Sequence, residues 1–182
     1  MIWNGHKLIY PDLFRFDSRF DIKGFLASRK SFLSSYEYDS PDKTFHALFP
    51  EHLDTLCRIS LVSPKWVLVS LQREQSLVDQ TITPSSQWKM DACLGFGVED
   101  DHMGRQRVLQ NFLGFYNQLV SGVPRCRQLF DEWTKTSAQE VQATVVQTPD
   151  PMTWLQLRYT PVFDILDINY HLWKRFFPED LA

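Results

Sequence analysis

The stretch VSPKWVLVSLQREQSLV, residues 62–78, combines the sequence signals of one amphipathic helix. Ser63 suits the N-cap, and Pro64 suits the first helical position because the amide it lacks has no partner inside the helix. At 100° per residue, Leu71 and Glu74 lie on the apolar stripe, opposite the polar residues. The stretch therefore predicts a helix with one carboxylate, Glu74, on its buried side.

A carboxylate in that position indicates two different roles. An ionised carboxylate is costly to bury, so a carboxyl group in apolar surroundings tends to hold its proton. A protonated carboxyl group is the general acid that glycosidic bond cleavage needs. In the alternative, Glu74 is a boundary residue that pairs with an arginine or a backbone N–H. A hydrolase would also need a second carboxylate, and the turn-rich segment after the helix offers Asp91, Glu99, Asp100 and Asp101.

Composition narrows the class of protein. The chain has 182 residues, 43% of them hydrophobic, which indicates a globular protein with a core, and we expect a single domain over residues 1–182. The net charge of −3 and the absence of a basic block argue against nucleic acid as a partner. No apolar run reaches the length of a membrane span. The five histidines have no metal-ligand spacing, and no phosphate-binding loop is present, so we expect no metal and no cofactor.

The N-terminus and the cysteines bear on the compartment. Residues 1–20 read as an irregular extension without the apolar central region of a signal peptide, and the initial Met favours a start in the cytosol over a removed leader. We expect Cys57, Cys93 and Cys126 to be reduced core residues, with a Cys93–Cys126 bridge as the alternative.

Hydrophobic periodicity and proline positions predict an all-α domain of six to eight helices with little or no β-structure. Residues 36–44 are expected to form a loop, and residues 141–151 a short extended piece or a loop. Besides the helix at 62–78, the expected helical segments are 21–34, 50–59, 105–120, 123–135, 151–160 up to Pro161, and 169–177.

Five segments, in order along the chain, match motifs of one family. DIKGFLASRKSFLSSY is similar to IQ-x-FL, and the stretch at 62–78 is similar to NP-x-x-LL-x-x-LQKEQSL. MDACLGFGVED is similar to A-x-GYG-x-x-D, FLGFYNQL to GFFNQ, and TWLQLRYTP to TYALYRYTP. The motifs are those of the bacterial lysozyme-like superfamily, which includes lytic transglycosylases and glucosaminidase-like peptidoglycan hydrolases. The resemblance covers about residues 20–178 and implies a helical lysozyme-like fold with a substrate cleft.

The resemblance also implies roles for individual residues. Glu74 would be the catalytic acid at the end of the helix that lines the sugar cleft, and Tyr159 would abut it. Phe96 departs from the motif, which has Tyr there, so hydrogen bonding to sugar at this position is in doubt. We expect substrate contacts from Gln75, Glu99, Asp101, Tyr116 and Gln118. We expect Asp91 to be the second catalytic carboxylate beside Glu74.

The expected function is cleavage of a β-1,4 bond in the glycan strand of peptidoglycan by general acid catalysis from Glu74. One alternative is a lytic transglycosylase, in which Glu74 acts as acid and then as base and the products are anhydro-muropeptides. Another is a non-catalytic glycan-binding module on the same scaffold. The site of action would be the bacterial wall or periplasm. A phage lysin, a virion enzyme or an injected effector would fit, and the effector would imply an immunity or inhibitor protein as partner.

Overall fold

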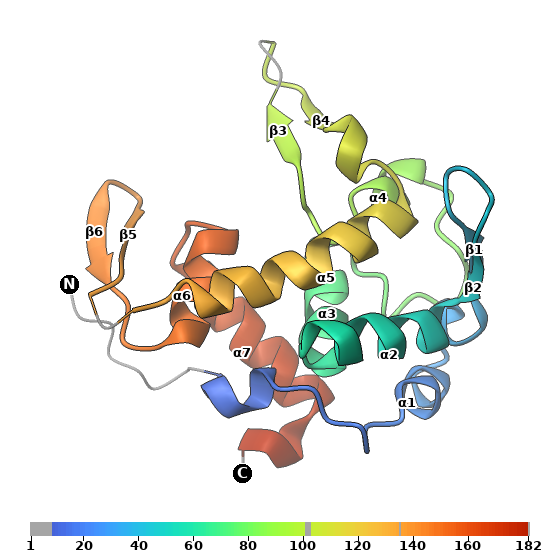
Figure 1. Ribbon diagram of the computed structural model, residues 1–182, viewed down its shortest axis with the longest axis horizontal. Coiled ribbons are helices and arrows are strands. Elements are labelled where there is room, and N and C mark those ends of the chain that lie inside the picture. Colours follow the sequence, from blue (N-terminus) through green and yellow to red (C-terminus); the bar gives the residue numbers. More distant parts are fainter. Residues whose placement is uncertain (1–8, 101–102, 135, 182) are drawn as a thin grey trace. The chain divides into compact units, whose positions relative to one another are not determined.

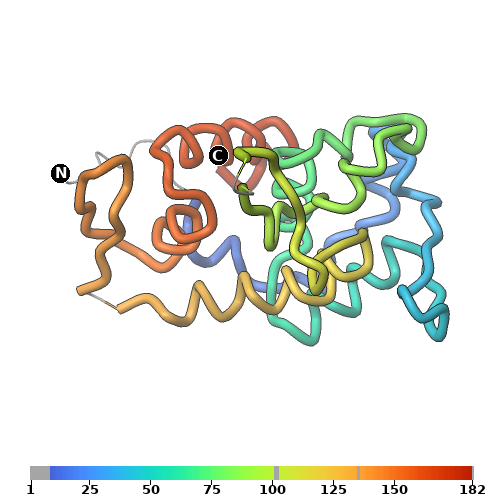
Figure 2. Tube along the Cα trace, turned by 90° about the horizontal axis from the view of Figure 1, so that it is seen from above, coloured from blue at the N-terminus to red at the C-terminus, as the bar shows by residue number. Residues whose placement is uncertain are grey.

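The computed structural model describes residues 9–100, 103–134 and 136–181. Residues 16–124 form one compact unit, and residues 125–182 form a second with the N-terminal stretch up to Arg15. The division falls inside helix α5 (Phe115–Asp131), which Figure 2 shows as a continuous helical trace. That a single domain spans the whole chain stays a prediction.

The unit of residues 16–124 contains helices and two hairpins (Figure 1). Each hairpin is a two-stranded antiparallel sheet, β1–β2 and β3–β4. The elements are α1 (Ile22–Ser28), η2 (Phe32–Ser35), β1 (Glu37–Asp39), β2 (His46–Leu48), α2 (Phe49–Ser60), α3 (Pro64–Gln75), α4 (Gln87–Asp91), β3 (Val98–Asp100), β4 (Gln106–Val108), η3 (Gln110–Phe112) and the first part of α5.

Helix α3 confirms the helix expected from residues 62–78. Pro64 occupies its first turn, and Ser63 is the N-cap residue by position, without a side-chain capping bond. Every residue from Trp66 to Leu71 is buried, so the middle of the helix is enclosed on all sides rather than along one stripe. Lys65 in the first turn and the residues of the last turn, which include Glu74, are only partly buried. Helix α3 is therefore a central helix whose end is presented to solvent.

Residues 21–48 differ from the expectation in two places. The helix expected over 21–34 ends at Ser28, because Lys30 takes a positive φ of 55°. Helical structure resumes only in the short 3-10 helix η2. Residues 36–44 were expected to be a loop, but Glu37–Asp39 pairs with His46–Leu48. The alternation of Tyr36, Glu37, Tyr38 and Asp39 is the period-two pattern of a strand.

The helix expected over 105–120 is also wrong in its first half. Gln106–Val108 is strand β4, in which Val108 pairs with Val98 and Arg107 with Glu99. Helix α5 begins only at Phe115, after Gly114 at φ +94°. It then continues to Asp131 without interruption, although the sequence indicated a break at residues 121–122 between two separate helices. Cross-strand pairing with residues 98–100 thus overrode a local helical pattern.

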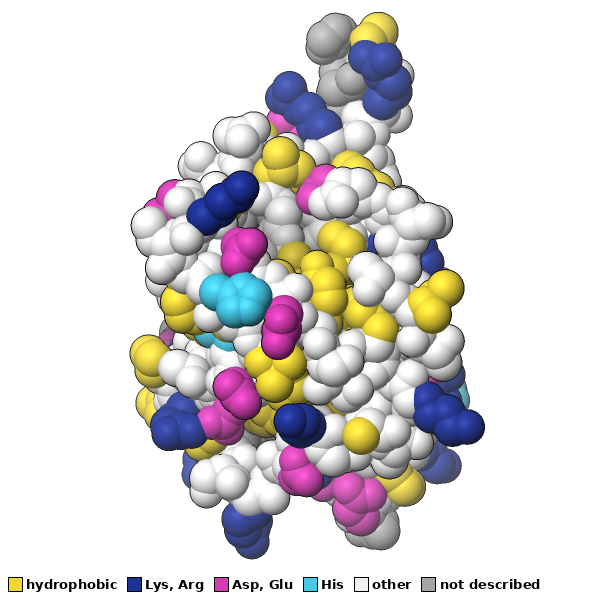
Figure 3. All heavy atoms as spheres, turned by 90° about the vertical axis from the view of Figure 1, so that its right-hand side faces the viewer, with side chains coloured by type: hydrophobic (Ala, Val, Ile, Leu, Met, Phe, Trp, Pro, Cys, Tyr) yellow, Lys and Arg dark blue, Asp and Glu magenta, His cyan; other side chains and the backbone are white. Residues whose placement is uncertain are grey.

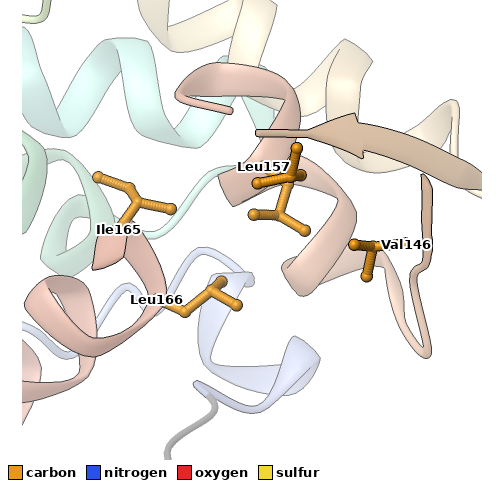
Figure 4. Close-up of a cluster of buried hydrophobic side chains, with 5 residues drawn as sticks. Val146, Leu157, Ile165 and Leu166 are labelled. Atoms are coloured by element: carbon orange, nitrogen blue, oxygen red, sulfur yellow. The ribbon is translucent and has the colours of Figure 1, made fainter. Parts of the chain in front are cut away.

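The second unit contains η1 (Pro11–Phe14), the hairpin β5 (Ala138–Val141) and β6 (Thr144–Gln147), α6 (Pro151–Tyr159), α7 (Asp164–Phe176) and η4 (Pro178–Leu181). Figure 4 shows Val146 of β6 near Leu157 of α6, and Ile165 and Leu166 of α7 in the same apolar cluster. This cluster explains why the hairpin forms at all, since a two-stranded sheet needs an apolar face to pack against.

The fold class is therefore mixed, not all-α with little or no β. The described residues contain seven helices and three antiparallel two-stranded sheets, with 12% of residues in strands. Each hairpin depends on pairing between residues three to eleven positions apart, which helical periodicity does not register. Cys57, Cys93 and Cys126 are buried and form no disulfide, as predicted. Within the part of the chain that the structure describes, no helix is long and apolar enough to cross a membrane.

Candidate functional site

Glu74 lies in the last turn of α3, one residue before the helix ends at Gln75. Ser76 takes the left-handed conformation (φ 58°) and donates its N–H to the carbonyl of Gln72 at 2.9 Å, which ends the helix. The Glu74 side chain retains 24% of its exposure. The carboxylate is therefore neither in the core nor in open solvent.

Arg73 is the neighbour that the sequence pattern did not predict. Its Nε and Nη2 donate to Oε1 of Glu74 at 2.8 and 2.6 Å, and its side chain is only 5% exposed. Adjacent residues do not share a helix face, so spacing rules do not indicate such a pair. Glu74 is therefore an ion-paired carboxylate, as the structural alternative expected, and not an isolated acid among apolar groups.

The glycine-rich turn of residues 92–97 closes over Glu74. A Cβ atom added at Gly95 would lie 2.9 Å from Oε2 of Glu74, and Gly95 has φ +73°. Only a residue without a side chain fits such a contact in that conformation. Gly97 of the turn lies against the ring of Phe112, and the ring of Phe96, also in the turn, packs on Gly122 of α5. Phe96 thus serves packing here.

Gln118 fixes this turn in place. Its side chain is fully buried, and its Oε1 accepts the backbone N–H groups of Leu94 and Phe96, each at 3.1 Å. Its Nε2 donates to the carbonyls of Phe96 and Phe112, each at 2.8 Å. The amide was predicted to contact sugar, but these four bonds use both its oxygen and its nitrogen. Gln118 therefore positions the turn that contacts Glu74.

The acidic candidates have partners of their own. Asp91, at the end of α4, accepts a hydrogen bond from Gln87 at 2.9 Å. Glu99 on β3 accepts two bonds from Arg107 on the paired strand, at 3.0 and 2.5 Å. Asp100 is exposed on β3. Glu99 and Asp100 thus lie on a solvent-exposed hairpin, where opposite charges on paired strands commonly face each other.

The expected roles of Gln75 and Tyr159 in the site stay predictions. Gln75 is partly buried at the last position of α3. Tyr159 ends α6 and belongs to the other compact unit, so its pairing with Glu74 stays a prediction. Asp101 lies outside the described residues. Among the described residues, no group of three His, Cys, Asp or Glu side chains could hold a metal ion.

A groove of about 410 Å³ lies beside these elements in the same unit. Its walls come from hairpin β1–β2, the segment leading into α4, and the start of α5. Its lining residues are Tyr36, Glu37, Tyr38, Asp39, Pro41, Thr83, Pro84, Gln87, Met90, Leu113, Gly114, Phe115 and Tyr116. Glu74 is not among them. Figure 3 shows a face of the molecule on which acidic side chains and a histidine border hydrophobic ones.

The predicted sugar contact Tyr116 belongs to this groove and is held by packing. Its ring lies 5.8 Å from that of His52 and 5.9 Å from that of Phe45, centroid to centroid. His52 Nδ1 shares a 2.5 Å hydrogen bond with the hydroxyl of Tyr38. Burial lowers the pKa of His52 and raises the pKa of Tyr38, so both remain neutral near pH 7. The wall of the groove is therefore an ordered aromatic layer.

The aromatic wall was missed at the level of sequence, although the alternation in residues 36–39 was a usable signal. The structure thus brings together three segments that resemble the lysozyme-like motifs, those of Glu74, of Gly95 and of Gln118. Comparison of the chain with known protein families, with curated proteins and with solved structures gave no match.

Proposed function

We propose that the protein cleaves the glycan strand of peptidoglycan, with Glu74 as the general acid. The observation that carries this proposal is the convergence of three distant segments on one carboxylate. Glu74 ends a buried helix, Gly95 approaches its Oε2, and Gln118 holds the turn that carries Gly95. A carboxyl group that must protonate a leaving oxygen needs such a fixed position within reach of substrate.

The ion pair with Arg73 adds a requirement to this mechanism. Two bonds from a guanidinium occupy the carboxylate oxygen that accepts them, whereas a general acid must present a protonated oxygen to the leaving group. Both bonds of Arg73 go to Oε1, and the Gly95 turn lies at Oε2. Binding of a glycan strand is therefore expected to move Arg73 away from Oε1 before proton transfer.

The decisive experiment compares the intact protein with Glu74→Gln on purified peptidoglycan. Loss of the general acid is expected to lower release of soluble muropeptides by about a hundredfold or more. Glu132→Gln is the matched control, because Glu132 also pairs with an arginine, Arg125, at 3.1 Å, in the other unit. Wild-type rates from a folded Glu74→Gln protein would overturn the proposal.

The products of the same reaction identify the nucleophile. Attack by water leaves a reducing end and requires a base, for which Asp91 is the candidate carboxylate in this unit. Attack by the sugar's own 6-hydroxyl gives an anhydro end and needs no second carboxylate. Mass spectrometry of the released fragments distinguishes a hydrolase from a lytic transglycosylase.

A second candidate function is a glycan-binding module without catalysis. The observation that favours it is the Arg73–Glu74 pair, which occupies the proposed acid. Equal binding of peptidoglycan by the wild type and by Glu74→Gln, with turnover by neither, would establish this function instead. If the protein is an injected antibacterial effector, an immunity protein that covers the site would be a further partner.

A further inference from the structure

The groove beside hairpin β1–β2 continues into a neighbouring hollow of about 520 Å³. The two share Pro41 and Tyr116 among their lining residues, so they form one surface along the hairpin. Its acidic lining residues are Glu37, Asp39 and Asp42, and none of its lining residues is Lys or Arg. The surface therefore favours a neutral or positively charged ligand.

The aromatic part of this surface is ordered by contacts between rings. Tyr36 and Tyr38 stack at 5.8 Å with an angle of 12° between their planes. Phe115 meets both rings edge-on, at 5.2 and 4.9 Å. Aromatic rings of this kind offer apolar contact to a sugar ring or an alkyl chain, and they attract a nearby cation.

The two strand carboxylates already hold a titratable cation. His46 Nδ1 lies 2.8 Å from Oδ1 of Asp39, and its Nε2 lies 3.5 Å from Oε2 of Glu37. The hydrogen bond to Asp39, with the charges of both carboxylates, raises the pKa of His46. The imidazole thus places a titratable base against both carboxylates beside the groove.

We propose that this surface, defined by Glu37, Asp39 and the stacked rings of Tyr36 and Tyr38, binds a primary ammonium group carried on a sugar or an alkyl chain. In a bacterial wall that chemistry has two sources, a glucosamine that lacks its acetyl group and the side-chain amine of a diamino acid in the stem peptide. The choice of the wall as source rests on the proposed function, whereas the preference for an ammonium group does not.

The experiment titrates the full chain, at pH 6 and low salt, with two pairs of probes. One pair is a glucosamine oligomer and the N-acetylglucosamine oligomer of equal length. The other is a stem peptide with a free side-chain amine and the same peptide with that amine acetylated. Two exposed ion pairs are expected to make the charged member of one pair bind about tenfold more tightly than its acetylated form. The pair that responds identifies the source of the amine.

Variants assign the preference to residues. Glu37→Gln with Asp39→Asn is expected to abolish it, and His46→Gln, which removes the resident cation, is expected to increase it by about threefold. Glu140→Gln is the matched control, because Glu140 is an exposed acid on the other unit's hairpin, and it should change nothing. Equal binding of charged and acetylated probes, or a preference that survives in the folded double variant, would overturn the proposal.

The same titration with Glu74→Gln keeps this proposal separate from the proposed function. Discrimination between the probes by a protein that never cleaves peptidoglycan would defeat the catalytic proposal alone. Cleavage that depends on Glu74, without discrimination, would defeat the ammonium site alone.

Discussion

Two fully buried glutamines, one in each compact unit, make different kinds of hydrogen bond. Gln118 bonds four backbone groups in the segments around residues 94–96 and 112. Gln156 of α6 bonds the side chain of Asn169 of α7 at 2.9 Å and the carbonyl of Met152 at 3.2 Å. The first amide shapes a turn that has no regular structure of its own, whereas the second joins two helices that already satisfy their backbones.

The difference shows how to separate a site from a core. A buried amide between helices can be replaced by apolar packing at modest cost, because few groups lose a partner. A buried amide that bonds four backbone groups of loop segments cannot, because each backbone group left behind loses that partner. Polar burial around the Gly95 turn therefore serves the placement of Glu74, and polar burial between α6 and α7 serves cohesion.

The largest expected effect comes from replacing the two amides with leucine. Gln118→Leu leaves four backbone groups without this partner and is expected to lower the free energy of unfolding by about 3 kcal/mol or more. Gln156→Leu should cost about 1–2 kcal/mol. Urea unfolding measures both, and only Gln118→Leu should also reduce peptidoglycan turnover and increase hydrogen exchange at the amides of Leu94 and Phe96.

Gln118→Glu tests the same idea if the leucine variant does not fold. A glutamate keeps the acceptor for two N–H groups and loses the donor to two carbonyls, so an intermediate loss of stability is expected. Equal stability losses for Gln118→Leu and Gln156→Leu, with turnover unchanged in both, would erase the distinction between the two regions.

A medium effect is expected at the glycine that contacts the carboxylate. Gly95→Ala forces a side chain into φ +73°, which costs about 1–2 kcal/mol, and drives its Cβ against Oε2 of Glu74. Gly104→Ala is the matched control, because Gly104 has the same φ of +73° and no atom of the described residues lies within 4 Å of the added Cβ.

Both alanine variants should lose similar stability in thermal unfolding, while only Gly95→Ala should slow turnover. The prediction fails if Gly104→Ala impairs turnover as strongly, because the effect would then come from backbone strain alone.

The smallest effect concerns two histidines whose burial differs. The pKa of exposed His46 is raised, mainly by its hydrogen bond to Asp39, so its contribution to stability is present below pH 6.5 and is lost as pH rises through the folded pKa. Burial among Tyr38, Phe45 and Tyr116 lowers the pKa of His52, so stability is lost as pH falls below 6.5 toward the folded pKa.

Proton NMR titration of the two imidazoles between pH 4 and 8 measures both values, and His46→Gln should flatten the part of the stability profile above pH 6.5. Titration of the two rings at the same pH would show that burial does not set their behaviour.

Local sequence rules predicted helices well where the apolar pattern was continuous. Helix α2 (Phe49–Ser60) agrees with the expectation over 50–59, and α3 and α6 begin at the prolines that marked their first turns. The hairpin β5–β6 was harder, because Gln142 and Ala143 adopt φ values of 48° and 60° at its two-residue turn. Two-residue turns with positive φ values normally contain Gly or Asn, and this turn contains neither.

The candidate site divides in the same way. The partial burial of Glu74 followed from its position on the helix, since helical periodicity depends on residues within a few positions. The ion pair with Arg73 depends on side-chain rotamers, and the loss of Gln118 as a sugar contact depends on a turn more than 20 residues away. Neither leaves a periodic signal.

The sequence by itself determined the helices α2, α3 and α6, that the chain has a substantial core, and that one carboxylate lies at the edge of that core. These properties depend on composition and on spacing within a few residues. Only the tertiary structure decided that Gly95 closes over Glu74, that Gln118 bonds the backbone of that turn at Leu94 and Phe96, and that acids and tyrosines line one groove. Those contacts join groups far apart in the chain, so the physical reason for each exists only once the backbone has folded.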